Sequence, residues 1–340
     1  MGCTLTVHTH RTSIFTLRTF TAVSRQLLAF WRSCSVERKP RGAELALVGV
    51  TLLWAGTFLL IKRALQWSDP IALVTVRFAL ATVAAIIVWR KSLSRLWEDR
   101  SLLQHGMVLG VTFGIGFFLQ TWGLLHTTIA RSAFFTGTFV VFVPLLQRIV
   151  WRRHPTAREW WGAALGIIGI VLLSNPDGGS FNRGDAATLL GALAWSYYMG
   201  YMSYAGIEHL GSLGTGGLVI LQCGVTAAFG GVWHLAAHLL NFSDVSFLGQ
   251  FSITWNLDVV IAVLYTSILA SVLATYIQTR LQPGVSATRV ALIFALEPVF
   301  ATLLGIVANG ERLTQREAIG AAAIVAAAML PAVVQLSQQR

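Results

Sequence analysis

The sequence predicts an all-α, polytopic membrane protein in which ten transmembrane helices form two inverted five-helix repeats. Three observations predict this fold. Hydrophobic residues make up 55% of the 340 residues and charged residues only 11%, against about 25% charged residues in a soluble domain. The apolar residues gather into runs long enough to cross a bilayer. The second half of the chain repeats motifs of the first half, as transporters with internal repeats do.

Each half contains five runs that fit the roughly 20 mostly apolar residues of a membrane-spanning helix. The runs of the first half are 45–61, 71–89, 106–125, 132–147 and 160–174. Those of the second half are 186–207, 210–233, 259–279, 290–308 and 318–334. The turn-forming segment Asn175-Pro-Asp-Gly-Gly-Ser separates the halves. We therefore expect a first repeat at 42–174, a linker at 175–183, a second repeat at 184–334 and a short C-terminal tail at 335–340.

The repeat is visible at a shift of 158 positions. This shift places Arg131-Ser-Ala-Phe-Phe on Arg289-Val-Ala-Leu-Ile, and Thr156-Ala-Arg-Glu on Thr314-Gln-Arg-Glu. A shared apolar composition does not produce a matched Thr-x-Arg-Glu. Because each half has an odd number of spans, the two repeats are expected to insert with opposite topology.

Positive charges predict the orientation in the membrane. With the N-terminus inside, eighteen Lys and Arg residues lie on the cytoplasmic side and six on the opposite side, a positive-inside bias that places both termini in the cytoplasm. The net charge of +11 is then explained by basic loops facing anionic lipid, and no nucleic-acid partner is expected. We expect a multi-pass protein of a bacterial plasma (inner) membrane.

Residues 1–41 form a basic N-terminal tail with no acidic residue before Glu37. Their composition fits a targeting segment, a disordered tail or a misassigned start of the gene, and these interpretations stay open. Neither the three cysteines nor the nearby pair His234 and His238 has the spacing of a metal site. No metal and no cofactor are expected.

Glu297 is the first candidate for function, since a carboxylate in the middle of a span is expensive to insert. It could carry a proton or bind a substrate ammonium group. Alternatively, it could cap the backbone groups freed by Pro298 or pair with an arginine. Pro298 and Pro144 are expected to kink their helices, because each removes a backbone hydrogen bond.

Two basic residues in or beside the first two spans could attract a carboxylate or phosphate. Arg77 lies within the second span and Lys62 ends the first. Either side chain could instead extend to the membrane surface as an anchor, which is the interpretation that we favour for Lys62.

Aromatic residues within the predicted spans would suit an amphipathic substrate, although Trp and Tyr are also common at membrane interfaces. The candidates for a substrate-binding cavity are Trp54, Phe58, Arg77, Trp122, Trp195, Tyr198 and Tyr265.

The chain resembles the EamA type of the drug/metabolite transporter superfamily. The resemblance is carried by Trp54-Ala-Gly-Thr-Phe-Leu-Leu-Ile-Lys62, Arg77-Phe78, Leu296-Glu297-Pro298-Val299-Phe300 and Gly310-Glu311-Arg-Leu-Thr314. It covers about residues 43–334. One departure is Arg153, which stands where the second repeat has Glu311.

The resemblance implies a secondary transporter of small organic metabolites, and we expect an exporter of amino acids or related amphipathic compounds. Transport would follow alternating access between the two repeats, and Glu297 permits proton coupling without requiring it. The expected partners are a small-molecule substrate and the lipid bilayer, with a homodimer left open. The alternative is a membrane-embedded enzyme or a lipid-handling protein. The chain lacks the nucleotide-binding and hydrolase motifs of an ATP-driven pump or a polytopic enzyme, so no enzyme is expected.

Overall fold

A computed structural model describes residues 40–174, 180–239, 251–309 and 314–337. Within these ranges the chain is helical, with a single isolated β-bridge between Ser68 and Ile253. The predictions for the N-terminal tail, for most of the linker, for Glu311 and for the last three residues lie outside the described residues.

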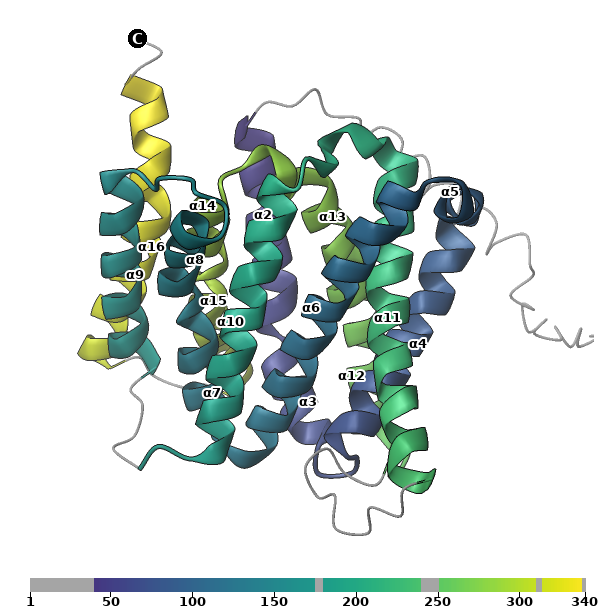
Figure 1. The fold of residues 1–340 in the computed structure, drawn as a ribbon. Coiled ribbons are helices and arrows are strands. Elements are labelled where there is room, and N and C mark those ends of the chain that lie inside the picture. Colours follow the sequence, from purple (N-terminus) through teal and green to yellow (C-terminus); the bar gives the residue numbers. More distant parts are fainter. Residues whose placement is uncertain (1–39, 175–179, 240–250, 310–313, 338–340) are drawn as a thin grey trace, which may run out of the picture. The chain divides into compact units, whose positions relative to one another are not determined.

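The helices are continuous in some predicted spans and interrupted in others (Figure 1). The first half contains α2 (Pro40–Ala55), α3 (Thr57–Ala64), α4 (Pro70–Val88), α5 (Ser92–Glu98), α6 (Arg100–His126), α7 (Ile129–Gly137), α8 (Phe139–Ile149) and α9 (Ala157–Ser174). The second half contains α10 (Arg183–Tyr204), η1 (Ile207–Leu210), α11 (Gly211–Leu239), α12 (Leu257–Tyr265), η2 (Thr266–Leu273), α13 (Ala274–Leu281), η3 (Gln282–Gly284), α14 (Ala287–Phe294), α15 (Glu297–Asn309) and α16 (Gln315–Ser337).

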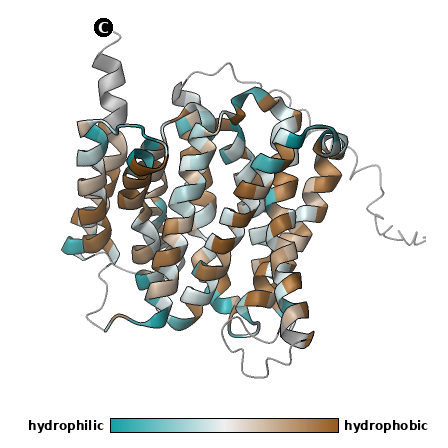
Figure 2. Cartoon of the chain, in the orientation of Figure 1, coloured by the Kyte–Doolittle hydropathy of each residue, from teal (hydrophilic) through white to brown (hydrophobic). Residues whose placement is uncertain are grey.

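Eight of the described helical stretches are long and apolar enough to cross a membrane. Their polar residues gather towards the helix ends, with apolar residues between them (Figure 2). The predicted class, an all-α polytopic membrane protein, is therefore confirmed, while the count of ten spans stays a prediction. The two further helices that the count of ten requires are α10 and α16, with 22 and 23 residues.

Consecutive spans alternate in direction, which can be followed by colour in Figure 1. As a result, the first helices of the two halves, α2 and α10, run in opposite directions: α2 begins at the top of Figure 1 and α10 at the bottom. The strongest packing joins α6 to α10 and α11, α4 to α11, and α9 to α16. The last pair lies at one edge of Figure 1.

The repeated Thr-x-Arg-Glu motif forms the same structure in both halves. Thr156 and Glu159 make reciprocal bonds before α9, with the Thr156 amide donating to the Glu159 carboxylate at 2.8 Å and the Glu159 amide donating to the Thr156 hydroxyl at 3.3 Å. Thr314 and Glu317 repeat both bonds at 2.8 and 3.3 Å before α16. The motif is a capping box that starts the last helix of each half.

Several spans are broken near their middle, and polar side chains satisfy the freed backbone. Between α2 and α3 the Tyr265 hydroxyl donates to the Leu53 carbonyl at 2.8 Å, and the Thr57 hydroxyl donates to the Trp54 carbonyl at 2.7 Å. The eighth predicted span contains η2, a stretch of π-helix. Such wide turns are frequent at functional sites because they redirect side chains and carbonyls.

The two prolines lie at different places relative to the breaks in their spans, and the kinks predicted at them stay predictions. Pro298 is the second residue of α15, directly after the break that separates α14 from α15. Pro144 lies inside α8, and the break in that span comes earlier, at Thr138 between α7 and α8. The position of Pro144 therefore does not mark where its span is interrupted.

Candidate functional site

The interrupted spans surround a cavity with about 520 Å³ of space, the open solvent at its mouth included. Both halves of the chain line it, through α2, α3, α4, α6, α7, α8, α10, α13, α14 and α15. The lining residues are Trp54, Thr57, Arg77, Phe117, Gln120, Thr136, Phe139, Trp195, Met199, Gln278, Phe294 and Glu297.

Arg77 is the cationic member of the cavity. Its side chain is 1% exposed, and Nη2 donates to the Ser271 hydroxyl of η2 at 3.2 Å. The guanidinium carbon lies 4.7 Å from the centre of the Phe78 ring and 4.6 Å from that of Phe117, which partly stabilises the charge. Nε and Nη1 have no hydrogen-bond partner within the described residues. Arg77 thus presents a buried cation with unused donors.

The π-helical segment η2 holds Arg77 from two sides. The Ser267 hydroxyl donates to the Arg77 backbone carbonyl at 2.8 Å, while Ser271 receives the guanidinium. The Ala270 carbonyl accepts the indole N–H of Trp54 at 2.9 Å. The π-helical segment η2 therefore holds both Arg77 and Trp54 in place in the wall of the cavity.

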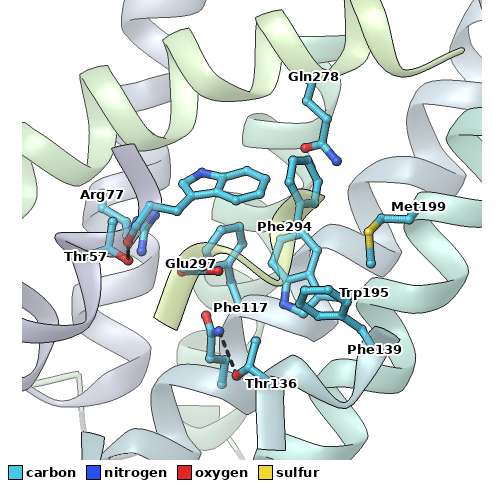
Figure 3. Close-up of a pocket in the computed structure, with 12 residues that line it drawn as sticks. Thr57, Arg77, Phe117, Thr136, Phe139, Trp195, Met199, Gln278, Phe294 and Glu297 are labelled. Atoms are coloured by element: carbon cyan, nitrogen blue, oxygen red, sulfur yellow. Dashed lines mark hydrogen bonds between the residues drawn. The ribbon is translucent and has the colours of Figure 1, made fainter. Parts of the chain in front are cut away.

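Glu297 is the anionic member. It opens α15 after the break in its span and is 8% exposed. Among the described residues, its carboxylate neither caps a backbone group nor pairs with an arginine. Within these residues, no contact supports either of the structural roles considered for Glu297, which were capping the backbone freed by Pro298 and pairing with an arginine. Figure 3 shows Arg77 and Glu297 among the aromatic rings of the same cavity.

Aromatic rings from both halves line the same cavity. The indoles of Trp54 and Trp195, which correspond at a shift of 141 positions, have ring centroids 6.5 Å apart. Phe294 meets Trp54 edge-on at 4.9 Å, and Phe117 meets Trp195 edge-on at 4.8 Å. These walls can hold the apolar part of a ligand, and their faces can hold a cation.

The cavity contains Trp54, Arg77, Trp195 and Glu297 of the predicted site residues. Phe58 lines a smaller neighbouring pocket that also includes Glu297 and Pro298. The cavity and its neighbour thus bring together residues far apart in the sequence.

Three other predicted cavity residues lie outside the cavity lining. The ring of Trp122 lies 4.2 Å from that of His126 near the end of α6. The buried Tyr198 donates its hydroxyl to Gln222 of α11 at 2.6 Å. Tyr265 supports the broken first span through Leu53. Each of these side chains makes a structural contact of its own.

Sequence reasoning missed two glutamines of the cavity that the repeat could have revealed. Gln120 and Gln278 correspond at the same shift of 158 positions and both line the cavity. Gln120 donates to the Thr136 hydroxyl at 3.2 Å. Gln278 donates to Gln282 at 2.7 Å, and its own Oε1 has no partner within the described residues. A polar residue repeated inside two spans was the available signal.

Lys62, for which an anchoring role is favoured above, also lies outside the cavity lining. Its ammonium group donates to the Leu124 carbonyl at 2.5 Å and the Thr127 carbonyl at 2.8 Å. These carbonyls lie at the end of α6, where cations are favourable. Lys62 therefore stabilises a helix end.

Comparison with known proteins identifies similar chains. A model of the EamA-like transporter family matches residues 41–175 and again residues 182–332. An uncharacterized transporter of Archaeoglobus fulgidus is 28% identical over 288 residues, covering 85% of each chain. The uncharacterized inner membrane transporter YedA of Escherichia coli K12 is 23% identical over 295 residues, covering 84% of this chain and 89% of the relative.

A solved crystal structure shares the fold. It superimposes with a TM-score of 0.65 over 88% of this chain and 99% of its own, at 21% sequence identity. The family resemblance drawn from the sequence is confirmed by the family model and these relatives.

Proposed function

Because the chain belongs to the EamA-like transporter family, we propose that it is a secondary transporter that exports amino acids or related amphipathic compounds. The observation that carries the proposal is the joint presence of Arg77 and Glu297 in one aromatic-walled cavity. An amino acid has a carboxylate that complements the unused donors of Arg77. Its ammonium group complements Glu297, and an apolar side chain fits the rings of Trp54 and Trp195.

Alternating access between two inverted repeats is the proposed mechanism. Two features support it: both halves line the cavity, and their first helices begin at opposite ends (Figure 1). Broken helices around a central site are typical of such transporters. We place both termini in the cytoplasm from the positive-inside bias alone. Export is the direction that the family resemblance implies.

Glu297 gives a route for coupling to protons. Its carboxyl group can hold a proton in one state and the ammonium group of the substrate in the other. Competition between proton and substrate for one carboxylate exchanges the two across the membrane. This role fits a carboxylate that has no partner of its own among the described residues.

The test is exchange of radiolabelled amino acids by purified protein in proteoliposomes. We expect exchange of at least one zwitterionic amino acid, and Arg77→Gln to raise its KM by about thirtyfold or more, since losing one partner of a buried ionic contact costs ~2 kcal/mol or more. The exposed Arg95→Gln is the matched control, because Arg95 lies on the short helix α5 away from the cavity.

Two results would contradict the proposal. One is the lack of exchange for every amino acid, amine and nucleoside tested. The other is an unchanged KM in Arg77→Gln.

A further inference from the structure

Two ion pairs join the halves of the chain within the described residues. Arg131 of α7 pairs with Asp185 of α10, with Nε donating to Oδ1 at 3.1 Å and Nη2 pairing with Oδ2. Arg289 of α14 pairs with Glu44 of α2, with Nε 2.6 Å from Oε1 and Nη2 donating to Oε2 at 3.0 Å. Both contacts are bidentate, the strongest geometry for an arginine and a carboxylate.

The two pairs are copies of one another under the internal repeat. Arg131 and Arg289 correspond at the shift of 158 positions, and Glu44 and Asp185 correspond at the shift of 141 that also relates the two tryptophans of the cavity. The backbone amide of each arginine donates to the N-cap hydroxyl of its own helix, at 3.2 Å in α7 and 3.3 Å in α14. Each pair joins the fourth span of one half to the first span of the other.

The pairs lie at opposite ends of the helices, with the cavity between them. Arg131 and Asp185 lie where α7 and α10 begin, and Arg289 and Glu44 lie where α14 and α2 begin, at the other end (Figure 1). Each arginine is on a helix that reaches the cavity, α7 through Thr136 and α14 through Phe294. A movement that separates one pair therefore moves a wall of the cavity at that end.

Burial makes each pair sensitive to such a movement. The side chain of Asp185 is fully buried and that of Arg131 is 10% exposed, while those of Arg289 and Glu44 are 13% and 16% exposed. Separating a buried pair without hydrating both groups is unfavourable, so a pair that opens has to open to water. While the pair is formed, Asp185 also accepts a hydrogen bond from the Thr127 hydroxyl at 2.8 Å.

We propose that Arg131–Asp185 and Arg289–Glu44 are the two gates of the transport cycle, each holding the cavity closed at its own end. One pair separates while the other remains formed. The proposal rests on the proposed transport function and assigns to four residues outside the cavity the control of which side the cavity faces. Both pairs are formed in this structure.

The test measures the side from which the cavity is reached. Thr136→Cys, introduced where the three native cysteines are replaced by alanine, serves as a reporter for membrane-impermeant thiol reagents added to either side of oriented vesicles. We expect Asp185→Asn to raise labelling about tenfold from the side where α7 begins, and Glu44→Gln to raise it about tenfold from the side where α14 begins. The exposed Glu98→Gln is the control and is expected to change neither rate.

Opposite changes in the two variants support the gates, and a purely structural contact does not produce them. Labelling that changes equally from both sides, or from neither side, overturns the proposal. A second measurement covers variants that fold poorly: Arg131→Cys with Asp185→Cys is oxidised to a disulfide. Exchange that stops on oxidation and returns on reduction supports the gate, and exchange at an unchanged rate in the crosslinked protein overturns it.

The labelling experiment needs no substrate, so its outcome is independent of the proposed amino-acid specificity. If labelling changes in opposite directions but no amino acid is exchanged, the gate proposal is supported and the proposed substrate class is rejected. If amino acids are exchanged but labelling does not change, the substrate class is supported and the gate proposal is rejected.

Discussion

At the scale of single residues, the sequence allowed two positions for the Arg77 side chain, and the structure shows one of them. An arginine within the second span fits either a surface anchor or a ligand. The structure buries it against Phe78, Phe117 and Ser271, which excludes the surface position. The deciding contacts come from η2, whose residues are almost 200 positions away in the sequence, so the sequence of the second span alone could not predict them.

Ser271→Ala tests whether Arg77 is held in place for a substrate. The change removes the hydrogen bond from Nη2, so the guanidinium loses its fixed orientation. We expect the KM for amino-acid exchange to rise roughly tenfold, from the ~1.5 kcal/mol of a hydrogen bond to a charged group. Thermal unfolding in detergent checks that the fold is retained, and the exposed Ser94→Ala is the control. An unchanged KM would show that Ser271 does not position Arg77.

Glu297→Gln separates coupling from transport. Glutamine has nearly the same shape but cannot exchange a proton at neutral pH. We expect amino-acid exchange at saturating substrate to continue, while a pH gradient no longer drives accumulation of substrate in proteoliposomes. Accumulation that follows the pH gradient as in the unchanged protein would reject the role of Glu297 in coupling, and leave it a role in binding alone.

At the scale of elements, eight of the predicted spans are helices long and apolar enough to cross a membrane, but the sequence did not predict where the spans are interrupted. Apolar runs identify the helices because a bilayer imposes their length. The break at Gly56 is supported by a side chain from a distant helix, since the Tyr265 hydroxyl donates to the Leu53 carbonyl. The break at Thr138 lies six residues before Pro144, and the kink predicted at Pro144 itself stays a prediction.

The packing of α9 on α16 depends on two glycines from matching helices. A Cβ at Gly169 would lie 2.8 Å from the Gly320 carbonyl oxygen, and a Cβ at Gly320 would lie 2.7 Å from the Gly169 carbonyl oxygen. Such close backbone approach is how small residues join membrane helices. The pair therefore sets the distance between α9 and α16.

Gly169→Ala is expected to lower the midpoint of thermal unfolding by several degrees, roughly the effect of 1–3 kcal/mol of overpacking. Gly49→Ala is the matched control, since a Cβ at Gly49 meets nothing within 4 Å and alanine favours a helix over glycine. We expect Gly49→Ala to leave the midpoint unchanged or to raise it. An equal fall in both variants would mean that the α9–α16 contact is not the cause.

At the scale of the whole molecule, the internal repeat explains more than the fold. It relates Trp54 to Trp195 in the cavity wall and Gln120 to Gln278 in its lining. It also relates the Thr-x-Arg-Glu motifs that begin α9 and α16. Both halves therefore contribute matching parts to the cavity and to its supports.

The repeat does not relate the two charges of the cavity. At the shift of 158 positions, Phe139 in the first half corresponds to Glu297 in the second. At the shift of 141 positions, Leu218 in the second half corresponds to Arg77 in the first. The scaffold is repeated, whereas the charged chemistry of the site is not.

The membrane topology of α10 is the last point that the fold leaves to experiment. Beyond Asp185, α10 has no charged residue, but it is rich in Gly, Ser and Tyr. It packs against α6, α7, α8 and α14 and lines the cavity through Trp195 and Met199. A helix surrounded by protein can be less apolar than one that faces lipid, so its modest hydropathy is compatible with a span. Ser180 and His209 are exposed residues on either side of it.

We expect Ser180→Cys and His209→Cys, each introduced where the native cysteines are replaced by alanine, to be labelled by an impermeant thiol reagent from opposite sides of the membrane. His209→Cys should share its side with the loop that precedes α9, reported by His154→Cys, because α9 and α10 would then both cross. Labelling of Ser180→Cys and His209→Cys from the same side would show that α10 does not span. The count of ten would then fail, and with it the opposite topology of the two halves on which alternating access by inverted repeats depends.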